Sequence, residues 1–330
     1  RSTPFPYTTL FRSGGIRMEH EPYLEEEHKD QLCKKDCKRI AGSLLFYYIL
    51  LFACAFTLGI ISSAYIMSGA SQTELETITN IFSMIATCFV TILTLVIYKK
   101  KLHVTIPYSL CKEWNFLSIL RYTIIAMGLS GAAGILIQLI NQILIHFGWV
   151  MTTPDFSMKP DITYNLSIVL STCIIAPIME ELLFRGLILQ TLKRYGNVFA
   201  ILVTSLLFAL LHGNLPQSVP VFALSMMICY VVLKSGSILP GIAIHFLNNA
   251  FAIMEVSLLS DNGQISTVFL ILEALFLLYA MFTLYQKRLI IRNYIIHNRG
   301  SRVRTFFSNW ISILFLVLCV FIMITSFQRT

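Results

Sequence analysis

Charged side chains are scarce in this chain of 330 residues: they make up 13% of the sequence, against 56% for hydrophobic residues. A soluble globular domain carries about twice that share of charge. Acidic residues are the rarer sign, since 17 Asp and Glu face 25 Lys and Arg and give a net charge of +8. The basic residues lie mainly in short loops between apolar runs, where they set membrane topology. The composition therefore predicts a polytopic membrane protein, and we expect no nucleic-acid partner.

Other absences narrow the possible functions. The sequence has no HExxH motif and no second cysteine pair near Cys33 and Cys37, so neither a zinc-protease helix nor a four-ligand zinc site is indicated. It has no internal repeat, whereas many transporters are built from two related halves. Five of its eight cysteines lie in apolar runs, where we interpret them as small hydrophobic residues, and we interpret Cys33 and Cys37 as reduced thiols.

The N-terminal residues differ from the rest. The stretch "PFPYTTLFRS" resembles the translation of a sequencing-adapter oligonucleotide. We therefore expect residues 1–17 to be an artefact and the natural protein to start at Met18. Residues 18–39 are too polar for a secretory signal peptide, and we expect them to form a cytoplasmic polar tail.

Nine apolar runs approach the roughly 20 residues that a membrane-spanning helix needs. They cover residues 41–67, 77–98, 119–148, 165–192, 197–212, 218–234, 238–257, 265–286 and 307–327. If the N-terminus is cytoplasmic, 20 Lys and Arg lie inside and only Lys159 and Arg329 outside; the other three precede Met18. This bias supports the orientation. We predict an all-α bundle of eight or nine transmembrane helices in a plasma membrane, with short basic loops typical of bacteria.

Polar side chains interrupt three of these runs, where each charge costs at least a few kcal/mol. They are Glu180, Glu181 and Arg185 in the fourth run, His212 at the end of the fifth, and His245, Asn248 and Asn249 in the seventh. Glu181 and Arg185 are four residues apart on one helix face and can pair. Glu180 is rotated from Glu181 by about 100° and faces elsewhere. Pro177 kinks the helix and frees a backbone carbonyl, which predicts a protein-lined cavity within the membrane.

The spacing also predicts which of these residues meet. Glu180 and His212 each lie 16 residues from Gly196 in the turn between their helices, so both would be about 24 Å from that turn. His245 would lie only about 12 Å from its own turn at residues 235–237, unless that loop dips inward.

These residue types indicate hydrolysis without a serine or cysteine nucleophile. A carboxylate that faces a histidine in a poorly hydrated pocket can activate water. A second histidine with an amide donor one turn away can stabilise a developing oxyanion. Structural ion pairing and hydrogen bonding explain any one of these residues as well, but they do not explain why all of them converge.

The segments "EELLFR" (180–185), "FALLH" (208–212) and "HFLNN" (245–249) resemble the EExxxR, FxxxH and HxxxN motifs of the CPBP family. This family (CAAX protease and bacteriocin-processing, or abortive-infection) comprises intramembrane endopeptidases. The resemblance covers roughly residues 160–255. It implies a catalytic core at 163–257, between N-terminal transmembrane helices at 40–162 and C-terminal ones at 258–330.

The resemblance also implies roles for individual residues. Glu180 would be the general base on water, with His212 assisting, and His245 and Asn249 would form the oxyanion hole. Glu181 and Arg185 would be supporting residues, and Phe208 would pack the site. The family works without a metal or other cofactor, within membrane lipid. Its members act on membrane-associated proteins or peptides, some of them prenylated.

Two other interpretations remain open. Glu180, His212 and His245 could be the three ligands of a catalytic zinc ion, which metal analysis of the purified protein would decide. Alternatively, the chain could be a non-catalytic scaffold or a transporter, with Glu255 and Glu273 lining an ion path. A scaffold would tolerate Glu180→Gln, whereas a protease would not.

Overall fold

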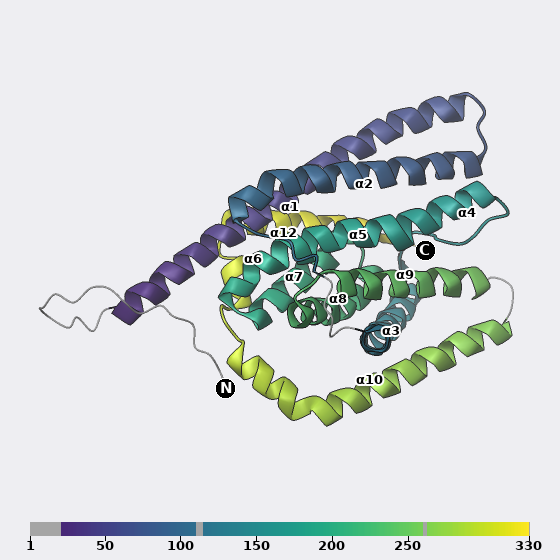
Figure 1. The fold of residues 1–330 in the computed structure, drawn as a ribbon. Helices are drawn as coiled ribbons and strands as arrows, with labels where there is room; N and C mark the ends of the chain where they lie inside the picture. The colour runs from purple at the N-terminus through teal and green to yellow at the C-terminus, as the bar shows by residue number, and fades with distance from the viewer. Residues whose placement is uncertain (1–20, 110–114, 260–262, 330) are drawn as a thin grey trace, which may run out of the picture.

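The fold is an all-α helical bundle, as the sequence predicts (Figure 1). It was obtained as a computed structural model, which describes residues 21–109, 115–259 and 263–329; the adapter-like leader at 1–17 lies outside these ranges. The long helices are α1 (Glu21–Met67), α2 (Gln72–Leu102), α3 (Phe116–His146), α8 (Leu215–Ser235), α9 (Leu239–Leu259) and α10 (Gly263–His297). One small antiparallel pair, β1 (Trp149–Met151) with β2 (Phe327–Arg329), was not predicted.

The fourth apolar run forms one continuous helical segment whose hydrogen-bond pattern changes along its length. Its parts are α4 (Ile162–Val169), the π-helix η1 (Leu170–Ile175), α5 (Ala176–Glu181), the π-helix η2 (Leu182–Ile188), α6 (Leu189–Leu192) and the 3₁₀ turn η3 (Lys193–Tyr195). π-helical turns are rare and occur frequently at functional sites. The two found here flank the α5 turn that carries Glu180 and Glu181.

Seven helices in the described part of the chain are long and apolar enough to cross a membrane. The predicted spans at 197–212 and 307–327 form the shorter helices α7 (Asn197–Leu211) and α12 (Trp310–Thr325), of 15 and 16 residues. A helix of 15 residues is about 22 Å long, less than the hydrocarbon thickness of about 30 Å. Gly196 and Gly213, with φ angles of 125° and 68°, flank α7. The multi-pass membrane fold is confirmed; the run at 197–212 forms a helix of about the predicted length, whereas the run at 307–327 forms a shorter one than expected.

Helix α1 begins well before the predicted first span and runs without a break through residue 39. Cys33, Cys37, Ile40 and Leu44 are fully buried. Their spacing of four, three and four residues places them on one helix face, which packs on the core. The segment interpreted as a polar tail therefore has one apolar face and is packed against the rest of the protein.

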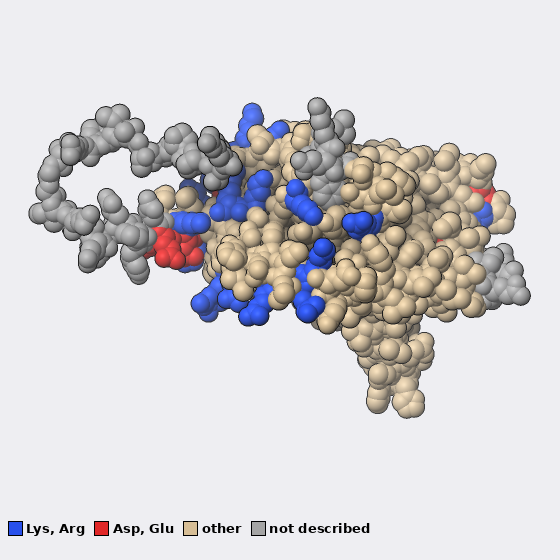
Figure 2. Space-filling view, turned by 60° about the horizontal axis from the view of Figure 1, so that its bottom comes forward, with Lys and Arg blue, Asp and Glu red and all other residues tan. Residues whose placement is uncertain are grey.

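Helix α8 lies at the centre of the bundle, packed against α3, α7 and α9. Large hydrophobic side chains on the outer helices point away from the core and are exposed, as expected where lipid replaces water. Figure 2 shows Lys and Arg gathered toward one end of the molecule. Lys99–Lys101 at the end of α2, Lys193 and Arg194 after α6, and Lys234 at the end of α8 belong to this basic end.

Candidate active site

The backbone around Pro177 leaves a carbonyl group available beside the carboxylates. In η1 the N–H of Ala176 donates to the carbonyl of Ser171, five residues back. The same pattern would pair the next carbonyl, that of Thr172, with residue 177, but proline has no N–H. The side chain of Asn249 supplies the missing donor, with its Nδ2 at 2.9 Å from the Thr172 oxygen. The predicted freed carbonyl therefore exists, and it fixes Asn249 against the fourth helical segment.

Glu181 and Arg185 form the ion pair that their spacing predicts. Arg185 Nη1 lies 2.8 Å from Glu181 Oε1, and both side chains are fully buried. Arg185 Nη2 donates to Ser225 Oγ on α8 at 2.8 Å. Because a lone buried charge is very costly, each of these two groups requires the other. The pair anchors the fourth helical segment to α8.

The same carboxylate also orients a histidine. His245 Nδ1 lies 3.1 Å from Glu181 Oε1, and the other ring nitrogen, Nε2, lies 3.7 Å from Glu180 Oε2. The two adjacent glutamates thus face opposite nitrogens of one imidazole ring. Glu181 lies behind the ring and is inaccessible, whereas the Glu180 side chain retains 27% of its exposure. Of these two carboxylates, only Glu180 is reachable from the cavity described below.

His212 is held in a defined tautomer by the backbone. Its Nδ1 lies 3.0 Å from the carbonyl oxygen of Phe208, one turn earlier. A carbonyl can only accept, so Nδ1 must carry the proton, and in the neutral ring Nε2 is then a proton acceptor. The Phe208 ring touches His212 and His245 edge-on, at centroid distances of 5.1 and 5.7 Å, and lies 4.6 Å from the guanidinium of Arg185. Phe208 therefore packs between the groups that the three motifs contribute.

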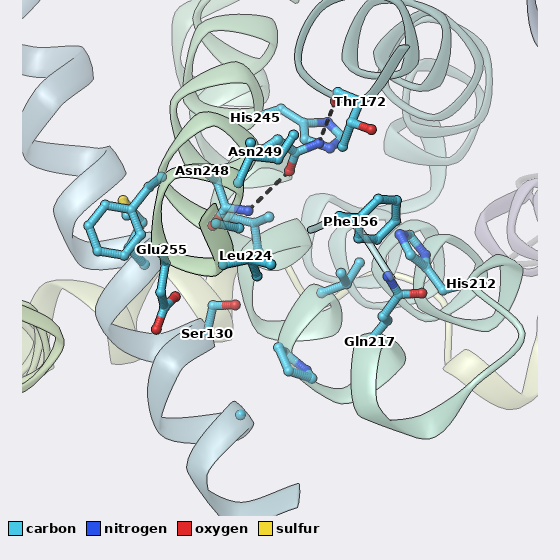
Figure 3. Close-up of a pocket in the computed structure, with 18 of the residues that line it drawn as sticks. Ser130, Phe156, Thr172, His212, Gln217, Leu224, His245, Asn248, Asn249 and Glu255 are labelled. Atoms are coloured by element: carbon cyan, nitrogen blue, oxygen red, sulfur yellow. Dashed lines mark hydrogen bonds between the residues drawn. The ribbon is translucent and has the colours of Figure 1, made fainter. Parts of the chain in front are cut away.

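A cavity of about 800 Å³ brings the predicted residues together. Glu180, His212, His245 and Asn249 all line it, and Figure 3 shows the last three around its interior. The supporting residues Glu181, Arg185 and Phe208 lie behind the wall rather than in it. Asn248 also lines the cavity and donates to Asn249 Oδ1 at 3.2 Å. Asn249 therefore has one remaining amide N–H that is not engaged by Thr172.

The residue count places His245 closer to its turn than Glu180 is to its own. The turn between α8 and α9 lies inside the protein, because Ser235, Ser237 and Ile238 are buried. The N–H of Ile238 donates to the carbonyl of Pro107 at 3.0 Å, so the segment after α2 covers this turn. His245 nevertheless reaches the level of Glu180, since its Nε2 lies 3.7 Å from Glu180 Oε2.

Glu255 and Glu273, which the transporter interpretation places on an ion path, line the same cavity as the catalytic candidates. In the described part of the chain, no three His, Cys, Asp or Glu side chains are grouped so that they could hold a metal ion. The proposed zinc ligands Glu180, His212 and His245 share a cavity wall but do not form such a group.

Sequence reasoning missed three positions that shape the site. Ser225 binds Arg185, Thr172 offers its carbonyl to Asn249, and Gly241 leaves room for Glu181. A Cβ at Gly241 would lie 3.1 Å from Glu181 Oε2 and 2.8 Å from Val232 Cγ2. Only Gly241 carried a signal, as a glycine one turn before His245 within an apolar run.

The family model "Type II CAAX prenyl endopeptidase Rce1-like" matches residues 162–251, a range that contains all three motifs. No curated protein and no solved structure matches the chain.

Proposed function

Since residues 162–251 match the Rce1-like family model, we propose that this protein cleaves a peptide bond of a membrane-associated protein or peptide with water activated by Glu180 and His212. The observation that carries the proposal is the different placement of two adjacent carboxylates. Glu180 faces the cavity, while Glu181 is fully buried behind His245 and paired with Arg185. This is the division expected between a reacting carboxylate and a positioning one.

The chemistry follows from these positions. Glu180 takes a proton from water, and the water oxygen forms a bond to the carbonyl carbon of the substrate. His212 assists by accepting a hydrogen bond at Nε2. His245, which must carry a proton on both ring nitrogens to donate from Nε2 as well, and the remaining N–H of Asn249 stabilise the oxyanion of the tetrahedral intermediate. Glu180 then returns its proton to the amide nitrogen as the carbon–nitrogen bond breaks, leaving a carboxylic acid and an amine.

The buried groups act by orientation. Arg185 pairs with the Glu181 carboxylate, which also accepts a hydrogen bond from His245 Nδ1. Ser225 fixes the guanidinium, so the arrangement is tied to α8 as well as to α9. We further place the basic end of the bundle in the cytoplasm of a cell whose plasma membrane holds the protein, with α1 starting on the cytoplasmic side.

A comparison of peptide termini tests the proposal. Membranes containing the wild-type protein or Glu180→Gln at equal levels are expected to differ by new termini that only the wild type produces. Such termini would also identify the substrates. If the two sets of membranes are identical while both proteins are folded, the protein is not a protease acting on any protein of that membrane, and the scaffold or transporter interpretation gains support.

Asn249→Ala is expected to have two separable effects. Loss of an oxyanion donor lowers kcat by about 10²–10³-fold. Loss of the bond to the half-buried Thr172 carbonyl also lowers the free energy of unfolding by about 1 kcal/mol, the net contribution of one hydrogen bond. Cleavage assays and unfolding in detergent measure the two. Asn248→Ala is the matched control, since this residue donates only to Asn249 among the bonds described. A larger rate loss in Asn248→Ala would assign the oxyanion role to Asn248.

A further inference from the structure

The walls of the cavity come from one half of the bundle. The residues that helix α8 contributes to the wall lie in its first half, within 216–224. Those that α10 contributes also lie in its first half, within 270–276. Helix α2 contributes 83–87 from its first half, and α9 contributes residues from His245 to Val256 near its end. These helix portions all lie away from the basic end. The cavity thus extends from Glu180 toward the opposite end of the molecule.

On the basic side of Glu180 the protein is closed. After Glu181, the fourth helical segment is almost entirely buried; its fully buried apolar side chains include Phe184, Leu187, Ile188, Leu189 and Leu192. The turn between α8 and α9 lies on the same side and is covered by the segment after α2, through the bond from Ile238 to Pro107. These layers separate the catalytic candidates from the basic end.

On the other side, loops at the ends of the helices reach the cavity. Phe156, from the connection between β1 and α4, lines it, as do Pro216 and Gln217 at the start of α8; Figure 3 shows Phe156 and Gln217 beside His212. Lys159 anchors the connection that carries Phe156 through an ion pair with Glu76 on α2. The hydrogen bond in this pair raises the pKa of Lys159 above its usual value and keeps it charged.

The difference in charge between the two ends indicates which side of the membrane the cavity faces. The basic end carries Lys99–Lys101, Lys193, Arg194 and Lys234, and such clusters remain in the cytoplasm. We infer that the cavity opens toward the outer face of the membrane. Its substrate class is then a peptide or juxtamembrane segment on that face, and not a cytoplasmic protein tail. This inference rests on the proposed function for the reaction, but the direction of opening can be measured without it.

Cysteine labelling with a sulfonated, membrane-impermeant maleimide tests the direction. Ala252→Cys lies on the cavity wall, and Phe156→Cys lies at its outer loop. Both are expected to react in intact spheroplasts, and in inverted membrane vesicles only after detergent is added. Lys234→Cys, exposed at the basic end, is expected to show the reverse. Met254→Cys is the matched control on α9: it is 48% exposed but not on the cavity wall, so it should face lipid and react in neither preparation.

The unsubstituted protein sets the background from its own cysteines. Reaction of Ala252→Cys in inverted vesicles alone would overturn the inference and place the opening on the cytoplasmic side. No reaction of Ala252→Cys in either preparation, while Phe156→Cys reacts, would overturn it too, because the cavity would then have no aqueous path. Labelling does not depend on cleavage, so neither result bears on whether Glu180 activates water.

Discussion

Glu180→Gln is expected to abolish cleavage, with a loss in kcat of about 10⁴-fold or more. General-base catalysis contributes up to about that factor, and the amide of Gln cannot accept a proton from water at neutral pH. The substitution keeps the size of the side chain and lies at the cavity wall. Glu180 makes a 3.7 Å contact with His245 and is otherwise without an ion pair in the described part of the chain. The fold should therefore be retained, and the loss should fall on kcat rather than on KM.

The control for this variant is another glutamate of the same cavity. Glu273 also lines it, yet it belongs to none of the three motifs. Glu273→Gln is expected to retain most of the cleavage rate toward a substrate identified from its new terminus. If Glu180→Gln cleaves at a near-normal rate, the proposed mechanism is wrong. If Glu273→Gln is the more damaging of the two, the functional carboxylate lies elsewhere in the cavity, as the ion-path interpretation would require.

The sequence predicts the site well where the residues concerned lie on one helix or on either side of one turn. The pairing of Glu181 with Arg185 follows from a spacing of four residues on one helix. Equal residue counts on either side of a tight turn predict a common level for Glu180 and His212, and both residues line the same cavity. Pro177 similarly predicts a freed carbonyl, and only the identity of that carbonyl, Thr172, required the π-helical register.

The contacts that the sequence does not predict join separate helices, and they depend on how those helices are rotated and shifted along their axes relative to one another. Ser225 meets Arg185 across a gap of 40 residues, and no periodicity within α8 marks that serine. The turn before His245 is buried beneath the segment that contains Pro107, a contact between parts of the chain about 130 residues apart. Helix α1 illustrates a different difficulty: its first half is polar in composition, so its apolar face at Cys33 and Cys37 is visible only when residues are placed around the helix axis.

Arg185→Met is expected to lower the free energy of unfolding by about 3–5 kcal/mol, because it leaves the carboxylate of Glu181 buried without its partner. The matched control is Arg194→Met. Arg194 also pairs with a carboxylate, that of Asp36 at 3.8 Å, but the Arg194 side chain is 39% exposed, and Asp36, which is 11% exposed, keeps Arg39 as a second partner. Exposed pairs contribute roughly 0–1 kcal/mol, so the control should remain close to wild type. Unfolding in mixed detergent micelles with increasing SDS measures both variants.

A double variant separates charge from packing. Combining Glu181→Gln with Arg185→Met removes both buried charges, so it should be less destabilised than Arg185→Met alone, since a neutral buried pair avoids the cost of an unpaired ion. It should nevertheless cleave poorly. The introduced amide would offer His245 Nδ1 only a neutral acceptor in place of the carboxylate at 3.1 Å, so the ring would lose the charged partner that orients it. Recovered stability without recovered activity would show that the ion pair positions His245 as well as holding the helices. If Arg185→Met and Arg194→Met lose the same stability, the buried pair is not the anchor that its geometry indicates.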